Sequence, residues 1–159
     1  MSADPGRHVP GRTAQGQTED SGKGAASFVL DSFAVLAYLN DEPGRDRIEA
    51  VLTAAGRREC RVHASMINIG EVLYITEREV SLSQAQAVMG ALDQLPIEII
   101  QAARQAVLAA AHIKANYRLS YADAFAVVAS QATGATIVTG DREFTTVAHL
   151  VNVEWLPAS

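Results

Sequence analysis

Four acidic side chains lie along the chain at places where a fold could bring them together: Asp31, Glu71, Asp123 and Asp141. Carboxylates that converge repel one another, and a hard divalent cation such as Mg²⁺ or Mn²⁺, which prefers oxygen ligands, relieves that repulsion. Water activated by such a cation beside an acidic cluster can hydrolyse a phosphodiester bond. These residue types therefore predict phosphodiester chemistry, provided that the fold brings the four side chains to one place.

The segment that ends at Asp141 predicts how two of these carboxylates meet. Ser120 is a good N-cap, so Asp123 falls in the first turn of a helix, and Gly134 ends that helix as a C′ residue. Residues 135–139 then form a short buried strand. The helix of about 13 residues and the strand of about five span ~20 and ~17 Å, so their lengths nearly match. Because the strand runs antiparallel to the helix, it ends beside the helix N-terminus, and Asp123 should lie near Asp141.

The other two acids are predicted at the same edge of a sheet. Asp31 directly follows an apolar strand predicted at residues 28–30. In open α/β folds, sites form at the carboxyl ends of the strands. Glu71 lies in a predicted helix between Ile69 and Val72, where a carboxylate without a partner would be costly to bury. All four acids are therefore candidate catalytic residues and candidate metal ligands.

Each acid also has a purely structural explanation. Asp31 could cap the helix that follows it, and Asp123 in a first helical turn favours the helix dipole. Glu71 could be a solvated helix residue, and Asp141 an ordinary turn residue. Capping and metal binding can coexist in one carboxylate, so these explanations do not exclude a site.

The pattern of apolar segments predicts the elements that must position these acids. Strands are predicted at residues 28–30, 60–63, 97–100, 135–139 and 151–155, and helices at residues 32–39, 45–55, 65–78, 81–95, 101–117 and 121–133. Strands that alternate with helices are typical of an α/β fold with a parallel sheet and helices on both faces. Residues 1–26 are rich in Gly, Ser, Thr and Gln without periodicity, which predicts a flexible N-terminal arm before a single domain at residues 27–159.

Composition bounds the class of protein. A hydrophobic content of 48% can form a core, and 18 acidic against 13 basic residues give a net charge of −5, which does not favour a general nucleic-acid coat. Cys60 is the only cysteine, so no disulfide can form within the chain, and a cytoplasmic location is expected. The chain has neither a run of 18 apolar residues nor an apolar N-terminal segment of the kind found in secretory signals, so we expect no membrane association.

Four motifs together resemble the PIN-domain ribonucleases, and most of all the VapC toxins of bacterial type II toxin–antitoxin systems. The motifs are VLDSFAVLAYL around Asp31, INIGEVLY around Glu71, LSYADAFAVVAS around Asp123 and TGDREF around Asp141. Each motif is weak alone, and their order and spacing over residues 28–156 make the resemblance specific.

The resemblance implies a three-layer α/β/α PIN-like fold whose central, mainly parallel sheet has about five short strands. It also implies an endoribonuclease dependent on Mg²⁺ or Mn²⁺, a homodimer, and a cognate antitoxin that blocks the site. Ser32 and Thr139 match the family's hydroxyl positions beside the first and last aspartates, where they would orient the acidic residues through hydrogen bonds. Arg142, Arg118 and Lys114 could contact RNA phosphate, although each is equally consistent with an exposed charge.

Two other functions remain open from the sequence. One is a non-catalytic PIN-like module that binds RNA or protein, although the four acids are all present. The other is a different Mg²⁺-dependent phosphoester hydrolase or phosphotransfer protein on a doubly wound sheet. A phosphatase of the haloacid dehalogenase type would carry Asp-x-Asp after the first strand, where this chain has Asp31-Ser32-Phe33.

Overall fold

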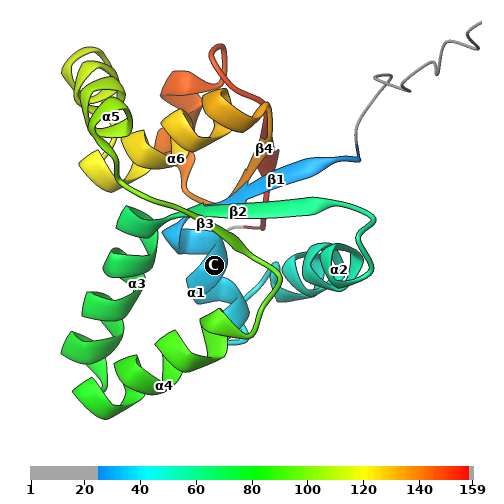
Figure 1. Cartoon of the computed structure of the whole chain (residues 1–159). Helices are drawn as coiled ribbons and strands as arrows, with labels where there is room; N and C mark the ends of the chain where they lie inside the picture. Colours follow the sequence, from blue (N-terminus) through cyan, green and yellow to red (C-terminus); the bar gives the residue numbers. More distant parts are fainter. Residues whose placement is uncertain (1–24, 158–159) are drawn as a thin grey trace, which may run out of the picture.

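A computed structural model describes residues 25–157. Strands and helices alternate along most of the chain, as the sequence predicts (Figure 1). In chain order the elements are β1 (Ser27–Leu30), α1 (Ser32–Leu39), α2 (Arg45–Gly56), β2 (Arg61–Ser65), α3 (Met66–Glu79), α4 (Leu82–Asp93), β3 (Glu98–Ile100), α5 (Arg104–Asn116), α6 (Tyr121–Thr133), β4 (Thr136–Thr139), the 3₁₀ helix η1 (Arg142–Val147) and β5 (Val153–Trp155). Almost all of the predicted N-terminal arm lies outside the described residues.

The five strands form one sheet in the order β3-β2-β1-β4-β5, and every neighbouring pair is parallel. Strand β1 lies at the centre of the sheet, β2 and β3 follow on one side of it, and β4 and β5 then follow on the other. The strand order therefore reverses between β1 and β4, and such a reversal opens a crevice at the carboxyl ends of the two strands. Asp31 directly follows β1, and Asp141 follows β4 after one glycine.

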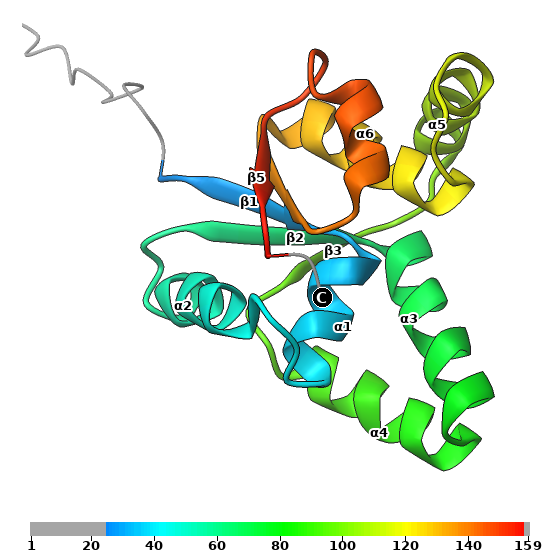
Figure 2. The same ribbon diagram turned by 180° about the vertical axis from the view of Figure 1, so that it is seen from behind.

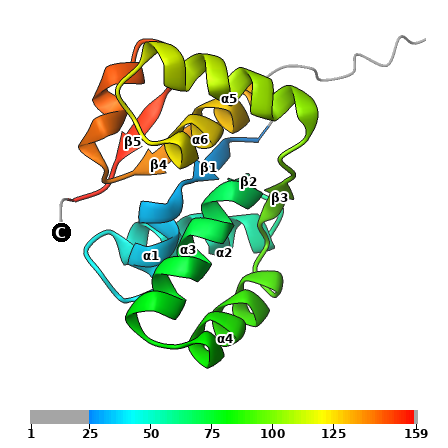
Figure 3. The same ribbon diagram turned by 90° about the vertical axis from the view of Figure 1, so that its left-hand side faces the viewer.

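Helices cover both faces of the sheet, which confirms the predicted three-layer α/β/α architecture (Figures 1 and 3). Helices α1–α4 lie on one face, and α5, α6 and η1 lie on the other. Alternate residues of a strand point to opposite faces, so β1 and β4 contribute to two cores. Leu30 and Val138 pack in the core under α1–α4, whereas Val29 and Ile137 pack in the core under α5 and α6.

Capping residues explain where the helices that bear the acids begin and end. Asp31 caps α1 by accepting from the backbone N–H of Ala34 at 2.9 Å, and Ser120 caps α6 by accepting from that of Asp123 at 3.1 Å. Gly134 follows α6 with φ = 70°, the left-handed conformation that favours glycine. These observations confirm the predicted helix and its two ends.

The remaining differences from the predicted elements are small, apart from one missed helix. Strand β5 begins at Val153 rather than at residue 151, and α5 begins at Arg104 rather than at residue 101, with no side chain capping it. Helix η1 was not predicted, although its buried Phe144 and Val147 are three residues apart, the repeat of a 3₁₀ helix. This helix packs beside β5 on the α6 face of the sheet (Figure 2). No helix among residues 25–157 is long and apolar enough to span a membrane.

Candidate active site

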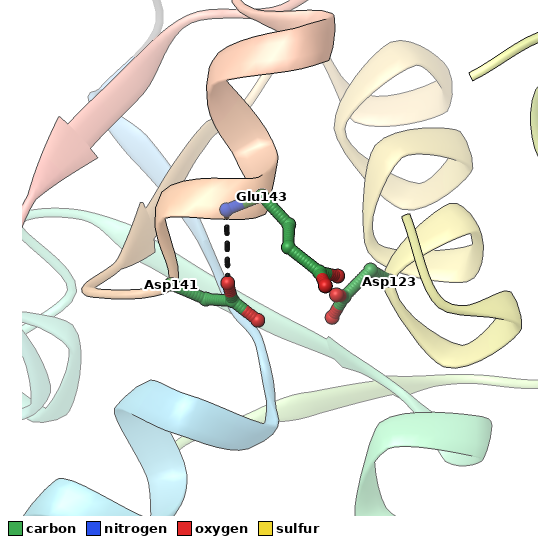
Figure 4. Close-up of side chains that lie close together, drawn as sticks. All are labelled: Asp123, Asp141 and Glu143. Atoms are coloured by element: carbon green, nitrogen blue, oxygen red, sulfur yellow. Dashed lines mark hydrogen bonds between the residues drawn. The ribbon is translucent and has the colours of Figure 1, made fainter. Parts of the chain in front are cut away.

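Three carboxylates converge at the carboxyl edge of the sheet, where β4 ends and α6 begins (Figure 4). They belong to Asp123 in the first turn of α6, Asp141 at the N-terminus of η1, and Glu143 within η1. One oxygen of each lies within 4.8 Å of the others, a spacing that a single cation could bridge. Asp123 and Asp141 were predicted to meet here, whereas Glu143 was not identified from the sequence.

The short turn after β4 explains why Glu143 joins the cluster. The carboxylate of Asp141 accepts a hydrogen bond from the backbone N–H of Glu143 at 2.9 Å, which starts η1 (Figure 4). Asp141 and Glu143, which are two residues apart, therefore lie on one tight turn, and the carboxylate of Asp141 caps the N-terminus of η1. Both acids stand in the TGDREF segment, but their convergence depends on the 3₁₀ turn, which the sequence pattern did not predict.

Asp31 lies at the base of the site and is almost fully buried. Its carboxylate accepts from the hydroxyl of Thr139 at 2.5 Å and from the backbone N–H of Ala34 at 2.9 Å. These two hydrogen bonds lower the pKa of Asp31, but burial and, to a smaller extent, the negative charges of Asp123 and Asp141 outweigh them and raise it from 3.8 to about 8. Asp31 therefore caps α1 and also lies close enough to Asp123 and Asp141 for their charges to affect it.

The electrostatic environment of Asp123 is similar. This side chain is 5% exposed, and burial is the largest cause of the rise in its pKa from 3.8 to about 7. The charges of Asp141, Glu71 and Glu143 also raise the pKa, so these acids act on one another as a group. No ion pair among residues 25–157 involves any of these carboxylates. The site therefore gathers negative charge without a basic side chain to neutralise it.

Glu71 stands at the margin of the cluster. It is half-buried on α3 and accepts a hydrogen bond from the hydroxyl of Tyr74 at 3.4 Å. Its charge affects Asp123, but its oxygens do not belong to the group that comes within 4.8 Å. Asp31 likewise lies outside that group. The structure thus brings two of the four predicted acids into close contact and places the other two nearby.

The two hydroxyl residues have different positions. Thr139 links the ends of β1 and β4, because its Oγ1 accepts from the backbone N–H of Asp141 at 3.0 Å and donates to Asp31. Ser32 instead bonds to Asn68 on α3, so it does not touch a carboxylate. The predicted hydrogen bond to an acidic residue is therefore present for Thr139, whereas Ser32 makes none and contacts Asn68 instead.

Within residues 25–157, none of the three basic residues predicted to bind RNA forms an ion pair with these carboxylates. The guanidinium of Arg142 stacks over the ring of Trp155, 4.8 Å from its centroid, at the end of β5. Arg118 and Lys114 are exposed near the end of α5. Contact of Arg142, Arg118 and Lys114 with RNA phosphate stays a prediction.

Gly140, between Thr139 and Asp141, is required by packing. A Cβ at this position would overlap the ring of Phe33 on α1. Glycine therefore lets the chain pass close to α1 as it leaves β4. Asp141 is thereby brought to the edge of the sheet at which Asp31 follows β1. The close approach explains the glycine in the TGD sequence.

Comparison with solved structures identifies the same architecture in known toxins. VapBC2 of Rickettsia felis, solved with a promoter DNA fragment, matches with a TM-score of 0.66 and 17% identity over 82% of this chain and 99% of that chain. VapC20 of Mycobacterium tuberculosis, described as a sarcin–ricin loop-cleaving toxin, matches with a TM-score of 0.65 and 17% identity over 82% and 99%. DNA-bound VapBC of Salmonella typhimurium matches with a TM-score of 0.63 and 20% identity over 81% and 97%. At such identities the likeness shows the fold.

Sequence comparison gives the family. No curated protein matches the chain significantly. The family model of the PIN domain matches residues 28–150, which include all five acids of the site. Since this match covers most of the chain, the protein belongs to the PIN domain family.

Proposed function

We propose that this protein is a metal-dependent endoribonuclease that hydrolyses RNA phosphodiester bonds and acts as the toxin of a type II toxin–antitoxin pair. The observation that carries the proposal is the convergence of Asp123, Asp141 and Glu143 beside the buried Asp31 at the crevice of the sheet. A cluster of this kind is destabilising without a cation, and its place is the one where α/β folds bind their ligands.

The residues fit a hard divalent cation. Asp123, Asp141 and Glu143 would hold the ion, with Asp31 and Glu71 beside them. The group contains only carboxylates, without histidine or cysteine, and such oxygen ligands favour Mg²⁺ or Mn²⁺ over zinc. When bound, such a cation polarises a phosphate oxygen and lowers the pKa of water.

The side chains of the protein supply the remaining requirements. The carboxylates around the ion would position an attacking water and accept its proton. Thr139 holds the carboxylate of Asp31 in place through its hydroxyl. Arg118, Lys114 and Arg142 would contact the phosphates that flank the cleaved bond.

The toxin role is supported by the relatives. VapC20 is described as cleaving the sarcin–ricin loop, and the Rickettsia and Salmonella structures hold VapBC on DNA. We propose for this chain a cytoplasmic homodimer held inactive by a cognate antitoxin. An arginine or lysine of the antitoxin would pair with the carboxylates and compete with the cation.

Cleavage of a structured RNA by the purified protein tests the enzymatic proposal. Activity should appear with Mg²⁺ or Mn²⁺, disappear with EDTA, and be abolished in Asp123→Asn. Glu77→Gln is a matched control, because it removes an exposed carboxylate from α3, the helix that carries Glu71. Cleavage that persists in EDTA contradicts the metal mechanism. Phosphate release from small phosphoesters without RNA cleavage would instead favour another phosphoester hydrolase.

Induced expression in bacteria tests the toxin role separately. Growth arrest should require intact Asp31 and should vanish when the adjacent antitoxin-like frame is co-expressed. An equally strong arrest by Asp31→Asn would contradict a nuclease toxin. Active enzyme that causes no arrest would favour a non-toxic RNase, and soluble protein with neither activity nor arrest would favour a binding module.

A further inference from the structure

Asn68 is a fully buried polar residue that joins three helices of the site. It lies in the first turn of α3, with 0% of its surface exposed. Its side-chain amide Nδ2 donates to the hydroxyl of Ser32 on α1 at 3.1 Å and to the backbone carbonyl of Ala122 on α6 at 3.2 Å. The hydroxyl of Ser32 in turn donates to the backbone carbonyl of Asn68 at 3.3 Å. One amide group therefore holds α3 against the N-terminal turns of α1 and α6.

Each of these contacts lies next to an acid. Ser32 directly follows Asp31, and Ala122 directly precedes Asp123. Glu71 lies on α3 three residues after Asn68, which is about one turn, so the two side chains are on the same side of the helix. A change in the amide would therefore shift the starts of the two helices that present the most deeply buried carboxylates.

The orientation of the amide is determined by its partners. The carbonyl of Ala122 can only accept a hydrogen bond, so Nδ2 must face it. This leaves Oδ1 of Asn68 without a partner, which is true of no other buried side-chain nitrogen or oxygen among residues 25–157. A buried acceptor without a donor costs stability, and this cost offsets part of what the two hydrogen bonds of Nδ2 contribute.

We propose that Asn68 is a positioning residue that sets the separation of Asp31 and Asp123 for the divalent cation. It acts through Ser32 and Ala122 and touches neither substrate nor ion. The inference rests on the proposed function, because it assigns Asn68 a role in preparing the same site. Groups that orient metal ligands from outside typically change metal affinity by about 10–100-fold when they are removed.

Mn²⁺ binding by Asn68→Ala tests the role, measured on the full chain from the electron paramagnetic resonance signal of free Mn²⁺. We expect the Kd for Mn²⁺ to rise about tenfold. Ser130→Ala is the matched control, because Ser130 is also buried and bonds to a backbone carbonyl, that of Ala135, but lies near the far end of α6. Both variants should lower the melting temperature in EDTA, whereas only Asn68→Ala should weaken Mn²⁺ binding.

Ser32→Ala provides a second test, which decides the matter if Asn68→Ala does not fold. It removes the contact to α1 and leaves the amide bonded to Ala122, so the Kd for Mn²⁺ should rise several-fold. Unchanged Mn²⁺ affinity in the variants that fold would overturn the positioning role, as would equal weakening in Ser130→Ala. Wild-type protein that binds no Mn²⁺ would overturn the proposed function itself, which separates the two failures.

Discussion

The substitution Asp31→Asn should stabilise the protein in the absence of metal. Asp31 is 1% exposed, and its pKa is raised to about 8, first because it is buried and then because Asp123 and Asp141 repel its charge. At pH 7 without a cation the folded protein therefore holds this carboxyl largely protonated. In the unfolded chain the same group ionises with a pKa of 3.8. Asparagine has nearly the same shape and needs no proton.

The size of the effect follows from the difference between the two pKa values. Keeping a group of pKa 3.8 protonated at pH 7 costs about 1.4 kcal/mol for each of roughly three pH units, or ~4 kcal/mol. The gain from asparagine is smaller, because its amide replaces the acceptor for the Thr139 hydroxyl and loses a hydrogen bond worth about 1–2 kcal/mol. We expect a net gain of about 2 kcal/mol, or roughly 4–8 °C in melting temperature for a domain of this size.

The gain should depend on pH with a definite sign. Between pH 4 and pH 8 the folded wild type binds more protons than the unfolded chain, so its free energy of unfolding falls as the pH rises. Asp31→Asn lacks this contribution, and its advantage should therefore be largest near pH 8 and should disappear toward pH 4. The pKa of Asp123 is also raised, so its ionisation lowers the free energy of unfolding with rising pH in the wild type and in Asp31→Asn alike.

Thermal melts in EDTA at pH 5 and pH 7 measure the effect, and Asp93→Asn, at an exposed residue of α4, is the control with no change expected. Mn²⁺ should then reverse the order. At a hundred times its Kd the ion stabilises the wild type by about 2.7 kcal/mol, and it should bind Asp31→Asn more weakly. A melting temperature of Asp31→Asn below that of wild type in EDTA at pH 7 would refute the reasoning.

Three further predictions concern other parts of the chain. Gly140→Ala should lower the free energy of unfolding by about 1–3 kcal/mol, because the added Cβ would clash with the ring of Phe33. Gly90→Ala, within α4, should raise it by about 0.5–1 kcal/mol, because a Cβ there meets no atom within 4 Å and alanine favours the helix. Urea unfolding compares the two variants. Glu143→Gln should raise the Kd for Mn²⁺ at least tenfold with little change in melting temperature in EDTA, and unchanged affinity would exclude Glu143 as a ligand. Deletion of residues 1–24, which lack apolar periodicity, should shift the melting temperature by no more than a few degrees, and a large drop would show that they pack on the domain.

Much of the architecture followed from local patterns in the sequence. Ser120 and Gly134 predicted both ends of α6, since a cap and a left-handed glycine act within one turn of the chain. The alternation of strands and helices predicted a parallel sheet, and matched helix and strand lengths predicted that Asp123 would meet Asp141. These features depend on neighbours along the chain, so the sequence alone was sufficient to predict them.

The features that were missed depend on contacts between distant segments. Glu143 enters the cluster only because η1 is a tight 3₁₀ turn, which has no long repeat to identify it. Asn68 was not singled out, because its partners lie 36 and 54 residues away in the chain. Hydrophobic periodicity predicts which face of α3 is buried, but not which polar side chain finds its partners there.

The hydrogen bond between Thr139 and Asp31 joins residues 108 positions apart, and it has a consequence for biosynthesis. The first strand of the sheet and its aspartate leave the ribosome before β4, the glycine turn and the last two acids are translated. A nascent chain, or a product cut short by a damaged message, therefore lacks Asp141 and Glu143 and cannot assemble the site. For the nuclease proposed here, translation itself therefore delays activity until Glu143 has left the ribosome and η1 can form.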